Sequence, residues 1–376
     1  MDHACDATAE RVARSLGFSC RDADPLVSFR NPFGLENGTM PVLELLVVGG
    51  AVFALVHAWR RWRRDGDPVN LSLWFASVVY LAVIEPPLYF PGWFGLEDQV
   101  GFIFSHNVFT VQFMYDRLPL YIVAFYPAIS QLAYELVRAL GVFARRGPLA
   151  GAVAVAFACQ VFYEIFDHLG PQLKWWAWNP DNRMINQPAL ASVPMNSMLL
   201  FASVSFGAMT YLVVRLAGTD DRRRSLTGGG LAWRTVLAGA ATPLAMIIAS
   251  APSGAFRGED QLGVQRAVLG IELAAVWIAG LYLLADAWLA HRAGAVPPVA
   301  SPGFVRTYPA LYLGVHIVLW LVALPAYLSA TGGVTEQGTP VGSLWYASLC
   351  AAAATAILLA ALRASAPRTA PEPVRS

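Results

Sequence analysis

Long apolar stretches, each about the length of a membrane-crossing helix, recur along almost the whole chain. A helix needs about 20 mostly apolar residues to cross a hydrocarbon core of about 30 Å. Nine stretches meet this requirement, so the expected fold class is all-α, a polytopic membrane helix bundle. They cover residues 41–59, 71–90, 118–143, 148–168, 192–214, 231–250, 266–289, 307–330 and 342–362.

The composition agrees with a chain that lies mostly in lipid. Hydrophobic residues make up 56% of the 376 residues and charged residues only 14%, whereas a soluble domain carries about 25% charged residues. The formal net charge is +1, and a nucleic-acid partner would call for a strong basic excess. We therefore expect membrane lipid, and no nucleic acid, around this protein.

Arginine collects in alternate connections between the predicted helices. Connections that carry many arginines face the cytoplasm in most membrane proteins, which predicts an outer N-terminus, an inner C-terminus and a multi-pass location in the cell membrane. The N-terminal 40 residues, with four arginines, are the one exception, although they also hold six acids. The connections assigned to the inside hold Arg60, Arg61, Arg63, Arg64, Arg145, Arg146, Arg215, Arg222, Arg223, Arg224, Arg292, Arg363, Arg368 and Arg375.

The chain divides into five predicted parts. Residues 1–40 form an extracytoplasmic segment without the basic-then-apolar plan of a signal peptide. Residues 41–292 form a core membrane domain of seven helices, and the Pro/Gly-rich linker 293–305 separates it from two C-terminal helices within 306–363. The tail, 364–376, has no apolar period and is predicted to be disordered.

Two of the four cysteines, Cys5 and Cys20, lie on the predicted outer, oxidising side. They could form a disulfide or remain two free thiols, because a single pair of cysteines is a weak sign of a disulfide framework. Cys159 and Cys350 fall within apolar helices, where we expect them to pack as small hydrophobic residues.

Ionisable residues inside the spans point to function. A charge in hydrocarbon costs several kcal/mol, so such residues usually face a cavity or a partner. In the inner half we expect Glu135 to pair with Arg138, and Asp286 lies near the last turn of its helix. Six acids from five helices fall in the outer third of the membrane: Glu44, Glu85, Asp116, Glu164, Asp167 and Glu272.

The densest group of these residues lies in the stretch 162–182, FYEIFDHLGPQLKWWAWNPDN. Glu164, Asp167 and His168 are three and four residues apart, so they share one helical face. The tryptophans that follow could form an interfacial aromatic belt, and Arg117 or Lys174 could neutralise one of the acids. Carboxyls beside an apolar, tryptophan-lined cavity can instead hold a proton at neutral pH, which suits an acid catalyst acting on an apolar substrate.

Metal and nucleotide chemistry find little support in the sequence. Zinc sites use several histidine or cysteine ligands, whereas His168 has no second histidine nearby. The only adjacent aspartates, Asp220 and Asp221, lie on the inner side beside three arginines. The P-loop, GxGxxG, HExxH and GxSxG patterns do not occur, so we expect no cofactor and no metal. We expect His106, in FSHNVF, to be a hydrogen-bonded interface histidine.

The segment 81–206 resembles the membrane carotenoid-biosynthesis proteins, which include the carotenoid 1,2-hydratases. The resemblance lies in VIEPPLYF around Glu85, in YDRLPLYIVAFYP (115–127), and in the stretch from FDHLGPQLKWWAWNP to SVPMN (166–196). This chain has Asp167-His168 where the family pattern has Asp-Pro, and the loop after Trp178 and the last four helices have no assigned counterpart. The positions that carry over are Glu85, Asp116, Asp167 and Asn196.

The resemblance implies a hydrophobic polyisoprenoid substrate, a carotenoid or terpenoid, and protonation of one of its double bonds. A neutral carboxylic acid would deliver the proton, and aromatic faces would stabilise the carbocation. Capture by water gives hydration, and capture by an alkene gives cyclisation. The expected catalytic residues are Glu85, Asp116, Glu164 and Asp167. The expected substrate-binding residues are Tyr89, Tyr115, Arg117, His168, Trp175, Trp176, Trp178 and Asn196.

A different class of protein would also place acids and prolines in its spans. The alternative is a small-molecule or lipid transporter, or a sensor, with an outward-facing acidic vestibule. Many transporters carry inverted repeats and broken helices in matching halves. The sequence shows neither signal. We favour the enzyme over this alternative and over a structural or accessory membrane protein.

Overall fold

The computed structural model describes residues 5–21, 23–31, 33–35, 37–218, 228–295 and 302–365. Within these residues, nine helical spans are long and apolar enough to cross a membrane, which confirms the predicted all-α, polytopic helix bundle. The spans are α2 (Met40–Asp65), α3 (Val69–Tyr89), α4 (Leu120–Ala139), α5 (Val142–Asp167), the π-helix η2 (Ser197–Val204) continued by α7 (Ser205–Ala217), α8 (Gly228–Gly254), α9 (Leu262–Arg292), α10 (Gly303–Leu328) and α11 (Leu344–Ala364).

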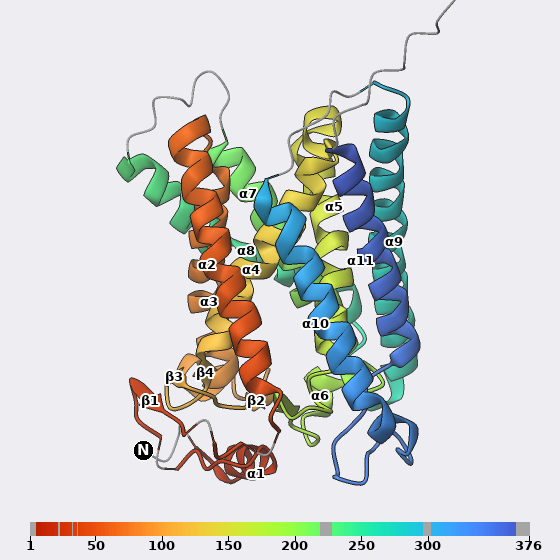
Figure 1. Cartoon of the computed structure of the whole chain (residues 1–376). Coiled ribbons are helices and arrows are strands. Elements are labelled where there is room, and N and C mark those ends of the chain that lie inside the picture. Colours follow the sequence, from red (N-terminus) through yellow and green to blue (C-terminus); the bar gives the residue numbers. More distant parts are fainter. Residues whose placement is uncertain are drawn as a thin grey trace, which may run out of the picture.

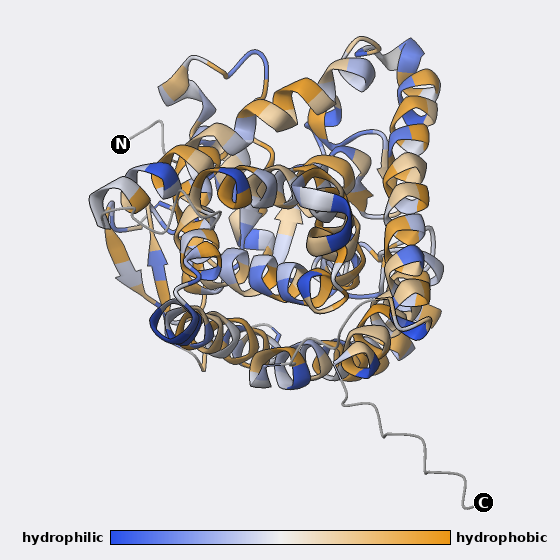
Figure 2. Cartoon of the chain, turned by 90° about the horizontal axis from the view of Figure 1, so that it is seen from above, coloured by the Kyte–Doolittle hydropathy of each residue, from blue (hydrophilic) through white to orange (hydrophobic). Residues whose placement is uncertain are grey.

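Helices α4 and α5 form the centre of the bundle. Within the most apolar stretch of each helix, the buried share is 89% in α4 and 78% in α5. The corresponding shares in α8 and α9 are only 28% and 22%. Helix α4 packs against α2, α3 and α5, while α5 also packs against α7, α9 and α11. Hydrophobic residues predominate along the helices (Figure 2), and many large ones on α8, α9 and α10 are exposed. An apolar surface of this kind is expected where lipid replaces water.

Glycine and proline explain where several helices start and stop. Helix α2 has Pro41 in its first turn and ends at Gly66, which adopts the left-handed conformation (φ 66°) that commonly terminates helices. Helix α5 changes direction at Gly147, where the backbone is not helical (φ 79°) and Pro148 follows. Such a break is expected because proline cannot continue the hydrogen-bond ladder.

Several predicted span boundaries differ from the helix ends of the structure by a few residues, and two of these differences have a clear local cause. The span predicted over 192–214 begins only at Ser197, because Ala189–Leu190 (β6) and Val193–Pro194 (β7) form a short hairpin before it. The span predicted over 118–143 covers only 120–139, because Pro119 is extended and Gly141 begins a new helix in the left-handed conformation. Apolar residues continue through both turns, so apolarity alone could not mark these ends.

The segment before α2 and the loops at the same end of the bundle fold together into a cap (Figure 1). Helix α1 (Ala7–Ser15) packs on β2 (Phe104–His106) and β5 (Trp176–Trp178). The first sheet has the order β1-β3-β4, and β2 pairs with β5 in a second one. The remaining cap elements are β1 (Val27–Phe29), η1 (Pro91–Phe94), β3 (Val111–Phe113), β4 (Leu118–Pro119), α6 (Arg183–Asn186) and η3 (Glu259–Gln261).

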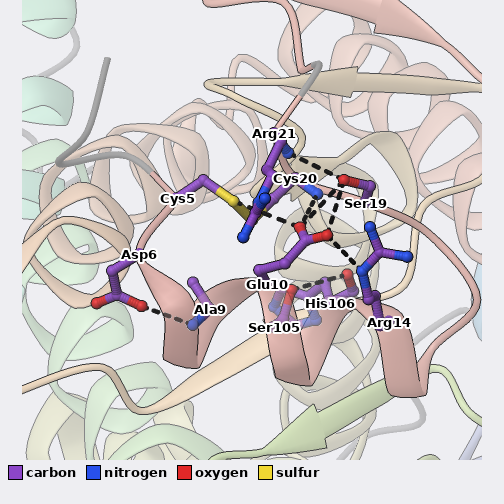
Figure 3. Close-up of a disulfide and its surroundings, with 10 residues drawn as sticks. All are labelled: Cys5, Asp6, Ala9, Glu10, Arg14, Ser19, Cys20, Arg21, Ser105 and His106. Atoms are coloured by element: carbon purple, nitrogen blue, oxygen red, sulfur yellow. Dashed lines mark hydrogen bonds and ion pairs between the residues drawn. A yellow bond between two sulfur atoms is a disulfide. The ribbon is translucent and has the colours of Figure 1, made fainter.

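Of the two states considered for Cys5 and Cys20, the structure has the disulfide (Figure 3). The buried Glu10 carboxylate lies beside it and accepts hydrogen bonds from the Cys20 N–H and the Ser19 hydroxyl, each at 3.0 Å. The Arg14 guanidinium lies 2.6 Å from the same carboxylate. Burial raises the pKa of Glu10, but these hydrogen bonds and Arg14 outweigh it, so the pKa is lowered overall.

The end of the bundle opposite the cap carries the described arginine-rich connections. The predicted pair of Glu135 and Arg138 is confirmed, with 2.7 Å between guanidinium and carboxylate. Asp286 pairs with Arg145 and Arg146 at 3.0 and 3.1 Å. Arg222 to Arg224, residues 296–301 of the predicted linker and the tail from 366 onward lie outside the described residues.

Candidate functional site

A cavity of about 330 Å³ lies near the cap end of the bundle, between α3, α5, η2 and α8. We call it the membrane cavity. Most of its lining is aliphatic or aromatic, with a few polar groups that converge on it. That combination is typical of sites for small, apolar ligands.

A π-helix forms part of the cavity wall. Ser197, Leu200 and Phe201 line the cavity from η2, where the chain makes wider turns than an α-helix. Such π-helical turns are uncommon and occur frequently at functional sites. The irregular geometry therefore falls where a ligand would lie.

Glu85 enters the cavity from the last turn of α3, just before Pro86 and Pro87. Its carboxyl is buried, with 4% exposure of the residue, and accepts a hydrogen bond from the Tyr126 hydroxyl at 2.5 Å. The Tyr89 hydroxyl also lies close to this carboxyl. Within the described chain, however, neither the Tyr89 hydroxyl nor Glu85 Oε2 makes a hydrogen bond of ordinary geometry. This carboxyl therefore keeps one buried oxygen for another partner.

Asp167 reaches the same cavity from the last residue of α5. It is also buried, and the Ser197 hydroxyl lies 3.3 Å from its Oδ2. Tyr163, one turn earlier on α5, lines the cavity and lies close to both Asp167 and Glu85. Two carboxyls from different helices thus share one apolar cavity with a phenol near both.

The pairing of β2 with β5 builds the aromatic wall at the cap end. His106 lies opposite Trp176, and Phe104 lies opposite Trp178. The Phe104 ring centre is 4.9 Å from that of His106 and 5.4 Å from that of Trp178, with the rings edge to face. Burial lowers the pKa of His106 to about 3, so its imidazole is neutral at neutral pH.

Five of the predicted site residues line the membrane cavity. They are Glu85, Asp167, Trp176, Trp178 and Asn196. The structure brings them together from α3, α5, β5 and the residue before η2, which are far apart in the sequence. The resemblance singled out three of them, Glu85, Asp167 and Asn196.

Glu164 and His168 lie elsewhere. Glu164 is completely buried, and its Oε2 is 3.4 Å from the His168 Nε2. The His168 Nδ1 accepts a hydrogen bond from the Ser343 N–H at 3.1 Å, and the ring packs edge-on against Tyr346 of α11. Residues three apart are about 60° apart around a helix. That offset suffices for Asp167 to line the membrane cavity while Glu164 does not.

Asp116 and Tyr115 belong to the cap rather than to the membrane cavity. With Met114 they form a run of left-handed backbone, with φ between 54° and 60°. Asp116 accepts a hydrogen bond from the Ser28 hydroxyl of β1, and Tyr115 packs edge-on against Trp93 at 5.8 Å. This turn fastens the N-terminal segment to the loop before α4.

The other predicted binding residues surround the cavity without lining it. Trp175 is completely buried and donates a hydrogen bond from its indole N–H to the Thr39 hydroxyl at 2.9 Å. Tyr89 and Arg117 line a second cavity, of about 420 Å³, within the cap. The Arg117 guanidinium lies 5.1 Å from the centre of the Phe102 ring.

Several lining residues were not predicted as site residues. His106 was expected at an interface, yet it lines the cavity, and only its pairing with Trp176 would have shown this. Helix α8 contributes Met246 and Ile247 although it lies far from the other lining segments in the sequence. Ile247 is 65% exposed, so the cavity wall extends to the outer surface of the bundle.

Comparison of this chain with protein-family models, with curated proteins and with solved structures finds no match.

Proposed function

We propose that this chain is a cell-membrane enzyme that hydrates or cyclises a polyisoprenoid by proton-initiated chemistry. One observation carries the proposal. Two buried carboxyls, Glu85 and Asp167, face a single aromatic cavity whose lining continues to the lipid-facing side of α8.

Glu85 is the proposed proton donor. An isolated charge is costly in an apolar cavity, and the Tyr126 hydroxyl is the hydrogen-bond partner described for this carboxyl. The neutral acid is therefore the proposed resting form, in which the O–H can point at a substrate double bond. Its position beside apolar side chains suits a substrate that is itself a hydrocarbon.

The aromatic lining would stabilise the positive charge that follows. Phe166 and Trp176, whose ring centres are 4.9 Å apart, line the cavity together with Tyr163 and Trp178. The faces of aromatic rings attract cations, and the attraction is stronger where water is excluded. Carbocation intermediates need such surroundings because a strong nucleophile would capture them too early.

The proposed reaction balances without a cofactor. The alkene π electrons form a new C–H bond to the proton of Glu85, which leaves a carbocation and the Glu85 carboxylate. Water, positioned by a hydrogen bond to the neutral Asp167 carboxyl, then forms a C–O bond and gives up a proton, and the Glu85 carboxylate or the neutral His106 imidazole accepts it. In cyclisation an internal alkene replaces water, and a carbon next to the final cation gives up the proton.

Helix α8 marks the proposed route for the substrate. Ile247 lines the cavity and is mostly exposed, and α8 and α9 make few contacts with each other. A long hydrocarbon dissolved in the bilayer could enter between these helices without crossing water. Soluble enzymes need a carrier for such substrates, whereas a membrane enzyme can take them from the lipid.

The test is product formation in deuterated water. Membranes that contain the protein are incubated with candidate isoprenoids, and products are analysed by mass spectrometry. We expect solvent deuterium at a former alkene carbon, with product lost in Glu85→Gln and retained in the matched control Glu272→Gln, an outer acid outside the cavity lining. Product that forms equally without Glu85, or only with added NAD or magnesium, would contradict the proposal.

One feature favours a second function, a transporter or sensor with an acidic vestibule. The cap cavity is lined by Asp6 and Glu97 in addition to Arg117. Uptake of a solute into sealed vesicles, together with no conversion of any isoprenoid, would favour this alternative over the enzyme.

A further inference from the structure

The last turn of α3 lines two cavities. The membrane cavity contains Glu85, and the cap cavity of about 420 Å³ contains Tyr89, which lies one helical turn further along. Residues four apart lie on the same face of a helix. One face of α3 therefore presents a carboxyl to the first cavity and a phenol to the second.

The cap cavity has the character of an aqueous vestibule. Asp6, Glu97 and Arg117 line it, and Trp93, which is 53% exposed, brings it to the surface of the cap. Burial lowers the pKa of Arg117 to about 10, so its guanidinium stays charged at neutral pH. Charged groups in a cavity of this size can hold ordered water, whereas purely apolar cavities stay dry.

Tyr89 lies between this vestibule and the membrane cavity. Its side chain is buried, with 3% exposure of the residue, and it interacts electrostatically with Glu85 of the membrane cavity and with Arg117 of the cap cavity. Neither the Tyr89 hydroxyl nor Glu85 Oε2 has an ordinary hydrogen bond within the described residues. Two neighbouring buried groups of this kind can be satisfied by each other or by one bridging water.

We propose that Tyr89 is the gate through which Glu85 exchanges its proton with the aqueous phase on the cap side. The inference rests on the proposed function in one respect, that Glu85 is the acid. It adds the side from which Glu85 regains its proton. In this proposal Tyr89 separates the aqueous side of the site from the hydrocarbon side.

The relay conserves atoms and charge. A hydronium ion in the vestibule gives a proton to the Tyr89 oxygen while the original phenolic proton passes to the Glu85 carboxylate. One O–H bond forms and one breaks at the phenol, which ends unchanged. The next double bond then meets a protonated Glu85, and this proton does not have to cross the hydrocarbon cavity.

Ring packing is the competing explanation for Tyr89. Its ring lies edge-on to Phe104 at 5.7 Å and to His106 at 6.0 Å. Tyr89→Phe keeps those ring contacts and removes only the hydroxyl, so it separates packing from proton transfer. Tyr115→Phe is the matched control, because Tyr115 packs on Trp93 without lining either cavity.

The experiment follows the Glu85 proton without any substrate. The full chain is reconstituted in lipid and moved from H₂O to D₂O, and infrared spectroscopy records the C=O band of protonated carboxyls. The band missing in Glu85→Gln belongs to Glu85. We expect Tyr89→Phe to slow the deuterium shift of this band on the order of tenfold or more, and Tyr115→Phe to leave it unchanged.

A second variant tests the vestibule itself. A Cβ at Gly92 has one neighbour, an oxygen of the surface residue Glu97 at 3.4 Å, so Gly92→Cys fits in the cavity lining. A bulky, membrane-impermeant thiol reagent should then slow the exchange of Glu85, whereas the same reagent on Gly38→Cys should not. Cys5 and Cys20 are joined in a disulfide, and Cys159 and Cys350 are buried.

Failure of the gate and failure of the enzyme are distinguishable. Exchange at the wild-type rate in Tyr89→Phe, or no band lost in Glu85→Gln, would overturn the gate. Slowed exchange in Tyr89→Phe supports it even if no isoprenoid is converted, and that result would refute only the proposed reaction.

Discussion

Glu135, near the end opposite the cap, and Glu85, near the cap, are equally removed from water but differ in their partners. The Glu135 carboxylate accepts hydrogen bonds from Arg138 at 2.7 and 2.9 Å and from Asn70 at 2.8 Å. His57 lies 3.4 Å away. Glu85 has one such bond, from Tyr126, and its second oxygen has none of ordinary geometry within the described chain.

The difference separates a structural carboxyl from a reactive one. A buried charge is tolerated where a cation and hydrogen bonds satisfy it completely, and the Glu135 network joins α2, α3 and α4 in that way. A buried polar group that keeps an open position costs stability and is retained where something else has to bind there. The same residue type thus has two roles, and its partners distinguish them.

The largest expected effect is on stability at the Glu135 network. Glu135→Gln leaves the Arg138 guanidinium without its carboxylate, and breaking a buried pair typically costs about 3–5 kcal/mol. Glu85→Gln should cost far less, because no described cation depends on it. Thermal unfolding of both variants in the same detergent checks the contrast. Equal losses would show that the two carboxyls have equivalent structural roles.

The next effect is on turnover at the membrane cavity. Glu85→Gln and Asp167→Asn should each lower turnover per folded molecule on the order of 100-fold, the usual contribution of a positioned acid or base. Glu164→Gln should leave turnover close to that of the wild type, because the structure places Glu164 beside His168, outside the cavity lining. A loss of turnover in Glu164→Gln as large as in Glu85→Gln would show that Glu164 also belongs to the reactive site.

A third effect concerns the cap, which covers the end of the bundle near Glu85. The disulfide joins residues 15 positions apart, and a loop of about 15 residues is worth about 3 kcal/mol. Replacing Cys5 and Cys20 by serine should therefore raise amide exchange in α1 while the melting of the helix bundle stays constant. A parallel loss of bundle stability would mean that cap and bundle unfold as one unit.

Position along a helix could be predicted from the sequence, and direction around the helix could not. The distance of Glu85 and Asp167 from their helix ends follows from counting apolar residues, so their common level was predictable. The membrane cavity, however, depends on which helices pack together. Helices α8 and α11 pack on α3 and α5 although they are far from them in the sequence. Asp167 and Glu164 therefore looked equivalent by spacing, although only Asp167 lines the cavity.

His106 illustrates the same limit in a loop. Its sequence surroundings, FSHNVF, carry no helical period and no ligand spacing. Its place in the cavity comes from pairing across the sheet with Trp176, which is 70 positions later in the chain. A register between strands this far apart is decided by the whole cap, so local patterns could not identify this residue.

The smallest expected effect is a pH dependence confined to the cap. The pKa of Glu10 lies below its ordinary value of 4.5, because the Cys20 N–H, the Ser19 hydroxyl and Arg14 stabilise its carboxylate. A carboxyl with a lowered pKa in the folded state contributes stability that is fully present above its unfolded pKa and is lost as the pH falls through the folded value. Amide exchange at Cys20, measured with the disulfide intact, should therefore stay constant from neutral pH down to 4.5 and become easier below it, after correction for intrinsic exchange. Glu10→Gln is the control, since its uncharged amide should make Cys20 easier to exchange at neutral pH and abolish the acid-dependent change. An unaltered acid-dependent change in Glu10→Gln would assign the effect to another carboxyl of the cap.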